Sequence, residues 1–274
     1  MPRPRSPRSR FLSRSFGDVR HACAASLDAL RLATMSIRAG DLDAAIVGGV
    51  ESWLTPIGLG SFAKLKALSR RPGAEAAIAS RPFDRLRGGL VPADGAAALI
   101  LETAQSARER GAPVFAKVAG VGATYDAYHP VAPIPDGSMA ARSILLALAD
   151  AGVGASDIDH VNCHGTSTPH NDVAETKALR IALGQRAEEI SLTASKSIFG
   201  HTLGAAGALE SAVTCLSIHH QFCPPTASLT EPDADCDLDF TPLAGRSQPI
   251  RFAVKVNFGF GGHNTCVVFA DPAA

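Results

Sequence analysis

Four residues that could do chemistry follow one another along this chain: a cysteine, a histidine, a lysine and a second histidine. Cys23 lies at the start of an Ala- and Leu-rich segment, and His164 begins the run His-Gly-Thr-Ser-Thr-Pro. Lys196 precedes His201 by five residues. A thiolate is a strong nucleophile, and a helix N-terminus or a nearby cation lowers the pKa of a thiol. One nucleophile, two imidazoles and one ammonium group therefore suit the chemistry of acyl thioesters.

A glycine-rich loop, Gly259-Phe260-Gly261-Gly262, follows these residues near the C-terminus. Glycine adopts positive φ readily, so such a loop can turn sharply and bring backbone N–H groups close to a reacting atom. Taken alone, the loop is also typical of a plain hairpin turn. Its value as a functional signal comes from its position after the cysteine, histidine, lysine and histidine.

A zinc site is the alternative use of cysteine and histidine. Such a site needs three or four ligands at suitable spacing. The adjacent pair Cys163 and His164 would point to opposite faces of a strand. The spacing therefore predicts no metal site.

In these motifs the chain resembles the β-ketoacyl-[acyl carrier protein] synthases, which are condensing enzymes of the thiolase superfamily. It is most similar to the elongating synthase II type and to the ketosynthase-alpha subunits of type II polyketide systems. The resemblance runs from about residue 16 to the C-terminus, and it includes residues 80–84, 126–129 and 237–240. It implies an acyltransferase that acts in fatty-acid elongation or, alternatively, in polyketide synthesis.

The resemblance implies a role for each reactive residue. Cys23 would carry the acyl group. His164 and His201 would donate hydrogen bonds to the malonyl thioester carbonyl while carbon dioxide leaves, and would so stabilise the enolate oxyanion. The backbone N–H groups of Cys23 and Phe260 would form the oxyanion hole for acyl transfer. Phe260, with Gly259, Gly261 and Gly262, would gate the acyl pocket.

Supporting residues are implied as well. Lys196 would be buried and ion-paired with Glu175, and Asp172 would fill a second acidic position. Asp126 and His129 would lie on a loop that moves with the gate.

Three positions depart from the family pattern. His21 stands where a small hydroxyl residue is usual, Gly88 replaces an aspartate, and Val256 replaces an asparagine. We expect the lost polar side chains to leave hydrogen-bond partners unpaired.

Composition limits the partners. Lys and Arg balance Asp and Glu at 26 each, which argues against nucleic acid. No apolar run reaches the roughly 18 residues of a membrane span. Six cysteines without a CxxC pair favour reduced thiols in the cytoplasm.

The family reaction implies no metal or organic cofactor. It implies an acidic acyl carrier protein bearing phosphopantetheine, and a homodimer or a heterodimer with a ketosynthase-like partner.

Apolar periodicity predicts helices over residues 24–38, 138–151, 171–183 and 203–220, with Asn171 or Asp172 as a helix cap. A buried strand is expected at 44–50, and further strands at 96–102, 115–121, 160–163, 192–196, 252–256 and 265–269. This alternation predicts an α/β fold. The resemblance implies the layered αβαβα fold of the thiolases, with residues 111–274 as a complete C-terminal half and 16–110 as part of an N-terminal half.

The first fifteen residues are expected to form a basic disordered tail. Residues 1–20 hold six arginines, four serines and three prolines. A transit peptide, a basic nucleic-acid arm and non-native coding sequence are the alternatives. Family members carry far more chain before the nucleophile than the 22 residues found here. This leaves open that the chain is an incomplete and inactive synthase fragment.

Overall fold

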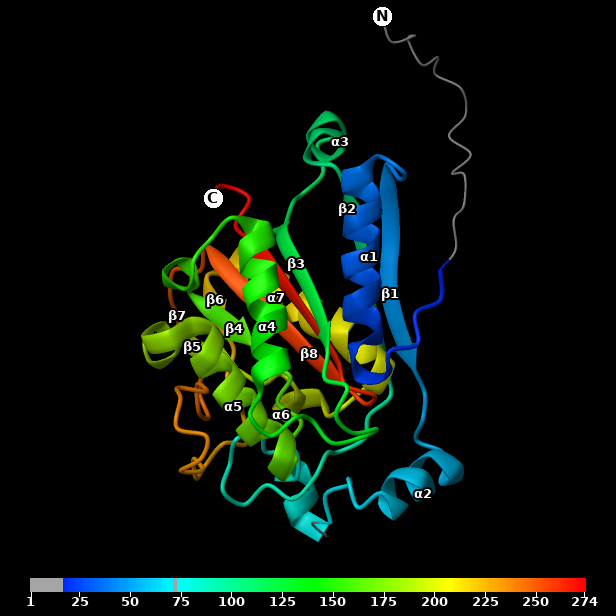
Figure 1. Cartoon of the computed structure of the whole chain (residues 1–274), viewed down its shortest axis with the longest axis vertical. Coiled ribbons are helices and arrows are strands. Elements are labelled where there is room, and N and C mark those ends of the chain that lie inside the picture. Colours follow the sequence, from blue (N-terminus) through cyan, green and yellow to red (C-terminus); the bar gives the residue numbers. More distant parts are fainter. Residues whose placement is uncertain (1–16, 71–72) are drawn as a thin grey trace, which may run out of the picture.

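The computed structural model describes residues 17–70 and 73–274, and it has the predicted α/β fold (Figure 1). The predicted basic tail, residues 1–15, lies outside the described residues. Within the described part, the strands form a five-stranded mixed sheet and two separate two-stranded ribbons.

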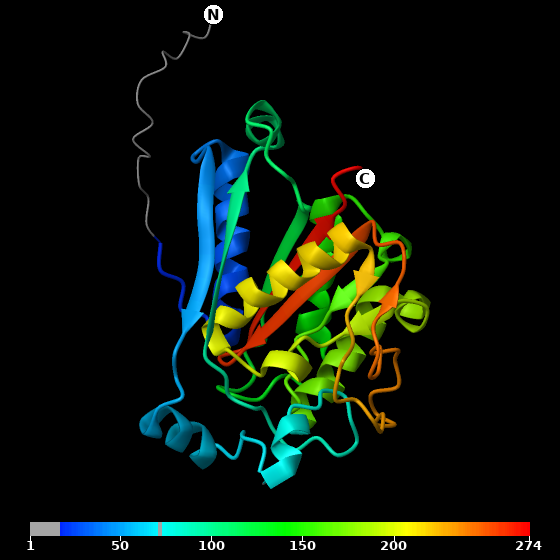
Figure 2. The same ribbon diagram turned by 180° about the vertical axis from the view of Figure 1, so that it is seen from behind.

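The five-stranded sheet occupies the second half of the chain. Its central strand, β8 (Phe252–Gly259), pairs antiparallel with β9 (His263–Ala270) on one side and parallel with β4 (His160–Asn162) on the other. The helices α4 (Ser138–Ala151) and α5 (Pro169–Leu183) lie on one side of it, and α7 (Ala206–His220) covers the opposite face (Figures 1 and 2). The strands run in the order β3 (Lys117–Tyr125), β9 (His263–Ala270), β8 (Phe252–Gly259), β4 (His160–Asn162) and β5 (Ser191–Thr193).

The connectivity of this half is partly repeated in the first half. Cys23 lies in a short 3-10 turn, η1 (Ala22–Ala24), which leads into α1 (Ala25–Ala39) and then into the antiparallel ribbon of β1 (Ala44–Glu51) and β2 (Gly95–Glu102). His201 is likewise followed by η5 (Leu203–Ala205), α7 and the antiparallel pair β8–β9. The chain thus places Cys23 and His201 at equivalent points of two related units.

The two equivalent helices, α1 and α7, pack against each other between the sheets. A Cβ atom on Gly207 would lie 2.4 Å from the backbone nitrogen of Leu27, so the helices approach closely only because residue 207 has no side chain. Four layers follow in order: α4 with α5, the five-stranded sheet, α1 with α7, and the β1–β2 ribbon. They correspond to the αβαβ part of the thiolase-like layered fold.

The outer face of the β1–β2 ribbon is exposed and apolar. Ile46 and Val50 are each 78% exposed, and Ile100 is 70% exposed. The prediction of a buried strand at 44–50 is therefore wrong for this face, because no described residue covers it. Only the inner face, which includes Val47, packs into a hydrophobic core with α1 and the large sheet.

The other elements connect these layers. α2 and α3 were not predicted, and each begins after a threonine whose side chain accepts a backbone N–H bond. The predicted cap of α5 is wrong: the helix begins after Thr168 with Pro169 in its first turn.

No helix among the described residues is long and apolar enough to cross a membrane. The remaining bounds are α2 (Pro56–Lys64), α3 (Ala104–Glu109), α6 (Lys196–Phe199), β6 (Phe222–Cys223), β7 (Arg246–Ser247), η2 (Gly73–Ile78), η3 (Ala155–Asp157) and η4 (Gly184–Glu188).

Candidate active site

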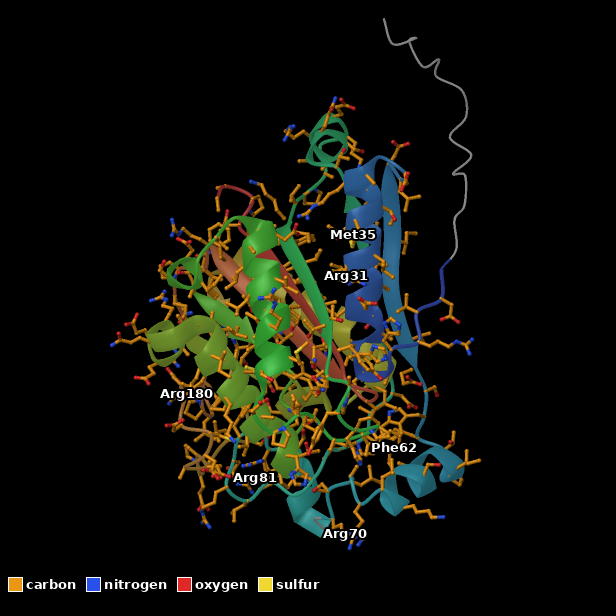
Figure 3. All side chains as sticks on the ribbon, in the orientation of Figure 1. Arg31, Met35, Phe62, Arg70, Arg81 and Arg180 are labelled. Atoms are coloured by element: carbon orange, nitrogen blue, oxygen red, sulfur yellow. The ribbon has the colours of Figure 1, made fainter. Side chains whose placement is uncertain are left out.

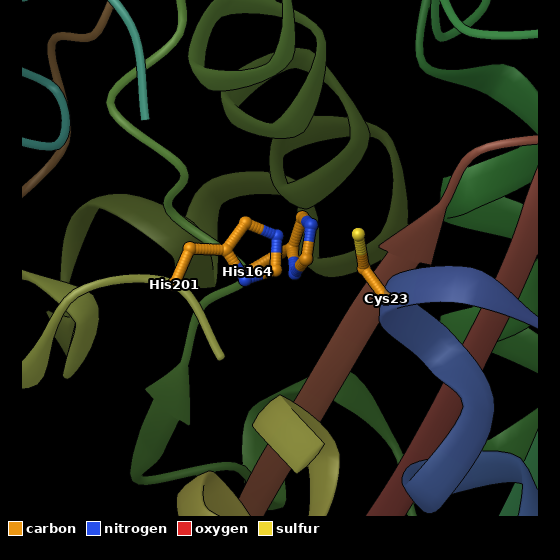
Figure 4. Close-up of side chains that lie close together, drawn as sticks. All are labelled: Cys23, His164 and His201. Atoms are coloured by element: carbon orange, nitrogen blue, oxygen red, sulfur yellow. The ribbon is translucent and has the colours of Figure 1, made fainter. Parts of the chain in front are cut away.

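Three of the predicted reactive side chains converge in the interior of the molecule (Figure 4). The sulfur of Cys23 and ring nitrogens of His164 and His201 lie within 4.8 Å of one another, and all three residues are buried. The cysteine comes from η1, the first histidine from the end of β4, and the second from the segment before α7. The two imidazole rings are nearly perpendicular, with centroids 5.5 Å apart.

The thiol of Cys23 lies in a tight backbone turn. Ala22 has φ of +48°, an uncommon conformation for a residue with a side chain. Burial raises the pKa of Cys23 to about 11, although the Lys196 ammonium and the backbone N–H groups of Phe260 and Cys23 oppose this rise. A lowered pKa was expected from the helix start, but the α-helical turns begin only at Ala25 and burial dominates. The thiol is therefore protonated near neutral pH.

We expect Cys23 to react with iodoacetamide at a rate that rises about tenfold per pH unit between pH 7 and 10, without a plateau, because the thiolate is the reactive form. Mass spectrometry of the Cys23 peptide measures this rate. Lys196→Met should slow the reaction at each pH, because the loss of the cation raises the pKa of the thiol further. A plateau below pH 8 would contradict the burial argument.

Both histidines present an N–H group toward the cysteine. Burial, followed by the charge of Lys196, lowers the pKa of His164 and of His201 well below the usual range, so both rings are neutral. The Nδ1 atom of His201 accepts the backbone N–H of Leu203 at 3.1 Å, and Nδ1 of His164 lies 3.3 Å from the Lys196 ammonium. A neutral ring whose Nδ1 accepts a hydrogen bond carries its proton on Nε2. The site therefore holds two imidazole donors.

The same three groups must be weighed as a metal site. Folding brings Cys23, His164 and His201 into ligand range of one another, which their spacing along the chain did not predict. Binding of a cation here would require both Nε2 atoms to give up their protons. The buried ammonium groups of Lys196 and Lys255 would also repel it. The donor set fits an oxyanion better than a metal ion.

Lys196 is buried and ion-paired, as the resemblance implies, but its partner is a different residue. Its ammonium group contacts Glu210 Oε1 and the backbone carbonyl of His164, each at 2.5 Å. The implied pairing with Glu175 is wrong. Glu175 instead accepts the backbone N–H groups of His164 at 2.6 Å and of Gly165 at 2.8 Å, so it shapes the turn after β4. Burial raises its pKa to about 7.

Asp172 stabilises the same turn from the next position along α5. Its carboxylate accepts the backbone N–H of Thr166 at 3.1 Å and that of Phe83 at 2.9 Å. It therefore joins the His-Gly-Thr turn to the loop at residues 80–84. Burial raises the pKa of this carboxyl group, and its hydrogen bonds with the charge of Arg87 partly offset the rise.

The glycine loop lies over the cysteine. Gly261 and Gly262 have φ of +88° and +86°, values that favour glycine. A Cβ atom on Gly259 would lie 2.6 Å from the backbone oxygen of His21, so the loop can approach the nucleophile segment only with glycine there. The Phe260 ring stacks on Phe62 of α2 with ring centroids 5.8 Å apart, and the backbone N–H of Phe260 faces the Cys23 sulfur. Phe62 is labelled in Figure 3.

The second predicted loop touches the gate, as expected from the family, through Asp126. Its backbone N–H donates to the carbonyl of Gly262 at 2.9 Å, and its carboxylate accepts the amide of Asn264 at 2.6 Å. His129 is exposed, and its ring accepts the backbone N–H groups of Val131 and Ala132 within its own loop. Asp126 therefore fastens the gate directly, whereas His129 shapes the loop beside it.

The three departures from the family pattern have different consequences. His21 bonds to Asp28 at 2.8 Å and stacks on His263 at 4.3 Å, so it leaves no gap. Val256 lies in the apolar core, and the carboxamide oxygen of the next residue, Asn257, has no hydrogen-bond partner among the described residues. Beside Gly88, Nε of Arg87 is buried without a hydrogen bond among the described residues and lies 3.6 Å from Oδ2 of Asp172.

Sequence reasoning missed three polar residues of the site: Glu210, Lys255 and Asn257. The sequence did contain a signal for Glu210 and for Lys255. Glu210 is an acid within the small-residue helix α7, and Lys255 is a cation within the apolar strand β8. A charge inside an otherwise buried element is rare unless it is paired. Nothing in the sequence singled out Asn257.

An open cleft of about 1150 Å³ leads away from Cys23 and Phe260. It is lined mainly by apolar side chains of α1, β1 and β2, among them Leu32, Ala45 and Val47. Such a lining suits a hydrocarbon chain attached to the cysteine.

Comparison with known proteins points to one family. Residues 18–107 match the N-terminal domain of beta-ketoacyl synthases, and residues 115–230 match their C-terminal domain. Over 248 residues the chain is 43% identical to 3-oxoacyl-[acyl-carrier-protein] synthase 2 of Synechocystis sp., a match that covers 90% of this chain and 59% of that protein. The chain thus spans about three fifths of the length of the curated relatives it matches.

Solved structures agree with this similarity. The ketosynthase in a complex of a type II polyketide acyl-carrier protein with its ketosynthase superposes with a TM-score of 0.92 at 40% identity, over 94% of this chain and 63% of that one. The ishigamide ketosynthase/chain length factor superposes with a TM-score of 0.84 at 35% identity, over 91% of this chain and 59% of that one.

Proposed function

This chain belongs to the β-ketoacyl synthase family, and from that premise we propose that it catalyses decarboxylative condensation in fatty-acid elongation. The observation that carries the proposal is the convergence of the Cys23 thiol with two imidazoles protonated on Nε2 and with the backbone N–H of Phe260. This arrangement offers one nucleophile and separate donors for two oxyanions.

The first half-reaction loads the enzyme. Cys23 attacks the acyl thioester of a carrier protein, a new thioester forms on its sulfur, and the carrier phosphopantetheine leaves as the thiol with the proton that Cys23 gave up. The backbone N–H groups of Cys23 and Phe260 stabilise the tetrahedral oxyanion. The apolar cleft receives the acyl chain.

The second half-reaction makes the carbon–carbon bond. Malonyl-carrier protein loses carbon dioxide, and the N–H groups of His164 and His201 hold the resulting enolate oxygen. The enolate carbon attacks the acyl-Cys23 thioester, the 3-oxoacyl product forms, and the cysteine thiolate takes a proton from water. The hydrogen-bond donors of the chain supply all the charge stabilisation, so the proposed reaction requires no metal or organic cofactor.

An acidic acyl carrier protein is the proposed partner. Exposed Lys64 and Lys66 at the end of α2, with Arg70 beyond them, lie near Phe62, which stacks on the gate residue Phe260. These charges suit an acidic protein and the phosphate of its prosthetic group. We further propose a cytoplasmic dimer, formed with a second copy or with a ketosynthase-like subunit such as a chain length factor.

A polyketide ketosynthase-alpha subunit is the second candidate. It is favoured by the similarity to a ketosynthase solved with its type II polyketide acyl-carrier protein. The two candidates share the residues and the reaction, and they differ in the carrier protein and in the number of extensions. Product length with each kind of carrier protein separates them.

A third candidate is an incomplete synthase without activity of its own. It is favoured by the exposed apolar face of the β1–β2 ribbon and by the free edges of both strands. Within the internal repeat, the equivalent strands β8 and β9 are flanked by β4 and β3. The ribbon lacks such neighbours among the described residues.

We expect the 274-residue chain alone to self-associate and to condense slowly, and an extended form that carries the N-terminal segment of a relative to be monodisperse and active. The measurements are size-exclusion chromatography, thermal unfolding and mass spectrometry of 3-oxoacyl-carrier protein from acyl- and malonyl-carrier protein. Full activity of the chain alone would reject the third candidate. No product from either form would reject the condensation proposal.

A further inference from the structure

Strand β8 presents two buried polar side chains to the active site. Lys255, Val256 and Asn257 are consecutive and all 0% exposed. Successive side chains of a strand point to opposite faces, so Val256 enters the apolar core while its two neighbours face Glu210 and His164.

The carboxamide of Asn257 is oriented by the contacts of its nitrogen, since its oxygen is buried without a hydrogen-bond partner among the described residues. Its amide nitrogen lies 3.2 Å from Glu210 Oε2 and 3.1 Å from His164 Nδ1. The opposite orientation would place the carboxamide oxygen against the carboxylate of Glu210, and both atoms can only accept. The Glu210 carboxylate therefore orients the carboxamide of Asn257 so that an N–H group faces the ring of His164.

Glu210 is itself held in place by two cations. Lys196 contacts one carboxylate oxygen at 2.5 Å, and Lys255 contacts the other at 2.7 Å. Lys255 also donates to the backbone carbonyls of Asn162 at 3.2 Å and of Cys163 at 3.0 Å, which directly precede His164. It therefore fixes both the carboxylate behind the carboxamide and the strand that carries the histidine.

Nδ1 of His164 therefore faces two groups that can only donate a hydrogen bond. These groups are the amide of Asn257 and the ammonium of Lys196. We propose that Asn257, held by Glu210 and Lys255, is a positioning residue that keeps the proton of His164 on Nε2, where it faces Cys23. This proton placement follows from the contacts alone. Its catalytic value rests on the proposed condensation, in which Nε2–H donates to the enolate oxygen.

The proton position is tested by nitrogen NMR of protein with ¹⁵N-labelled histidine, assigned with His164→Gln. In the unmodified sequence we expect the His164 resonances of a neutral ring protonated on Nε2. In Asn257→Leu, which has similar volume but no donor, only the Lys196 ammonium still donates toward Nδ1, so we expect a minor Nδ1-protonated population that the wild type lacks. A wild-type ring protonated on Nδ1, or an Asn257→Leu spectrum identical to the wild type, would overturn the proposal.

The functional consequence is measured separately. Asn257→Leu should lower malonyl decarboxylation roughly tenfold, the effect expected of one hydrogen bond, with loading of Cys23 within about twofold of wild type. Asn257→Ser, which keeps a donor, should recover part of the loss. Gln248→Leu removes an amide that bonds to Ser191 away from the site and serves as the control. If the wild type decarboxylates nothing, the proposed function fails while the NMR result still decides the proton position.

Discussion

Replacement of Cys23 by alanine is expected to abolish acyl loading. The imidazoles of His164 and His201 and the backbone N–H of Phe260 all converge on the sulfur of Cys23. Without this sulfur, the groups that would assist acyl transfer have no nucleophile beside them. The other cysteines do not offer a substitute: burial raises the pKa of Cys215 to about 12, and Cys163 lies in the core. Intact-protein mass spectrometry after incubation with acyl-carrier protein measures the adduct.

Cys23→Gln separates the two half-reactions. Its carboxamide resembles the acylated cysteine, so this variant should load nothing yet still release carbon dioxide from malonyl-carrier protein. Cys215→Ala is the matched control and should load normally. An acyl adduct on Cys163 or Cys215 with Cys23 unmodified would contradict the assignment of the nucleophile.

The second large effect is expected from the histidines. His164→Ala and His201→Ala should each lower malonyl decarboxylation by about 100-fold or more, the usual loss on removal of one oxyanion donor. Loading of Cys23 should change much less, because its oxyanion is held by the backbone N–H groups of Cys23 and Phe260. Rates of carbon dioxide release and of adduct formation are compared for each variant.

Two further substitutions test whether the donor itself matters. His164→Gln keeps an N–H group and should recover part of the decarboxylation that alanine loses. His220→Ala removes an exposed histidine at the end of α7 and should leave both rates unchanged. Equal losses of loading and decarboxylation in the two active-site alanine variants would indicate a structural role instead.

Much of the local structure was predictable because it depends on short-range patterns. The helix at residues 24–38, the helix at 138–151 and the strand pair around the glycine loop follow from apolar periodicity and glycine placement, and all three are confirmed. The positions of Cys23 and His201 before related helix–strand units are also visible in the sequence. Residue type and order, with the family resemblance, therefore singled out Cys23, His164 and His201, which the fold brings together.

What the sequence could not determine is which groups meet and in what charge state. The partner of Lys196 proved to be Glu210 rather than Glu175, because the distance between α7 and β4 decides the contact and spacing along the chain does not. The pKa of Cys23 is raised rather than lowered, because the effect of burial outweighs that of the nearby Lys196 ammonium. Both outcomes depend on desolvation and through-space distance, which are properties of the packed interior and have no counterpart in a local sequence pattern.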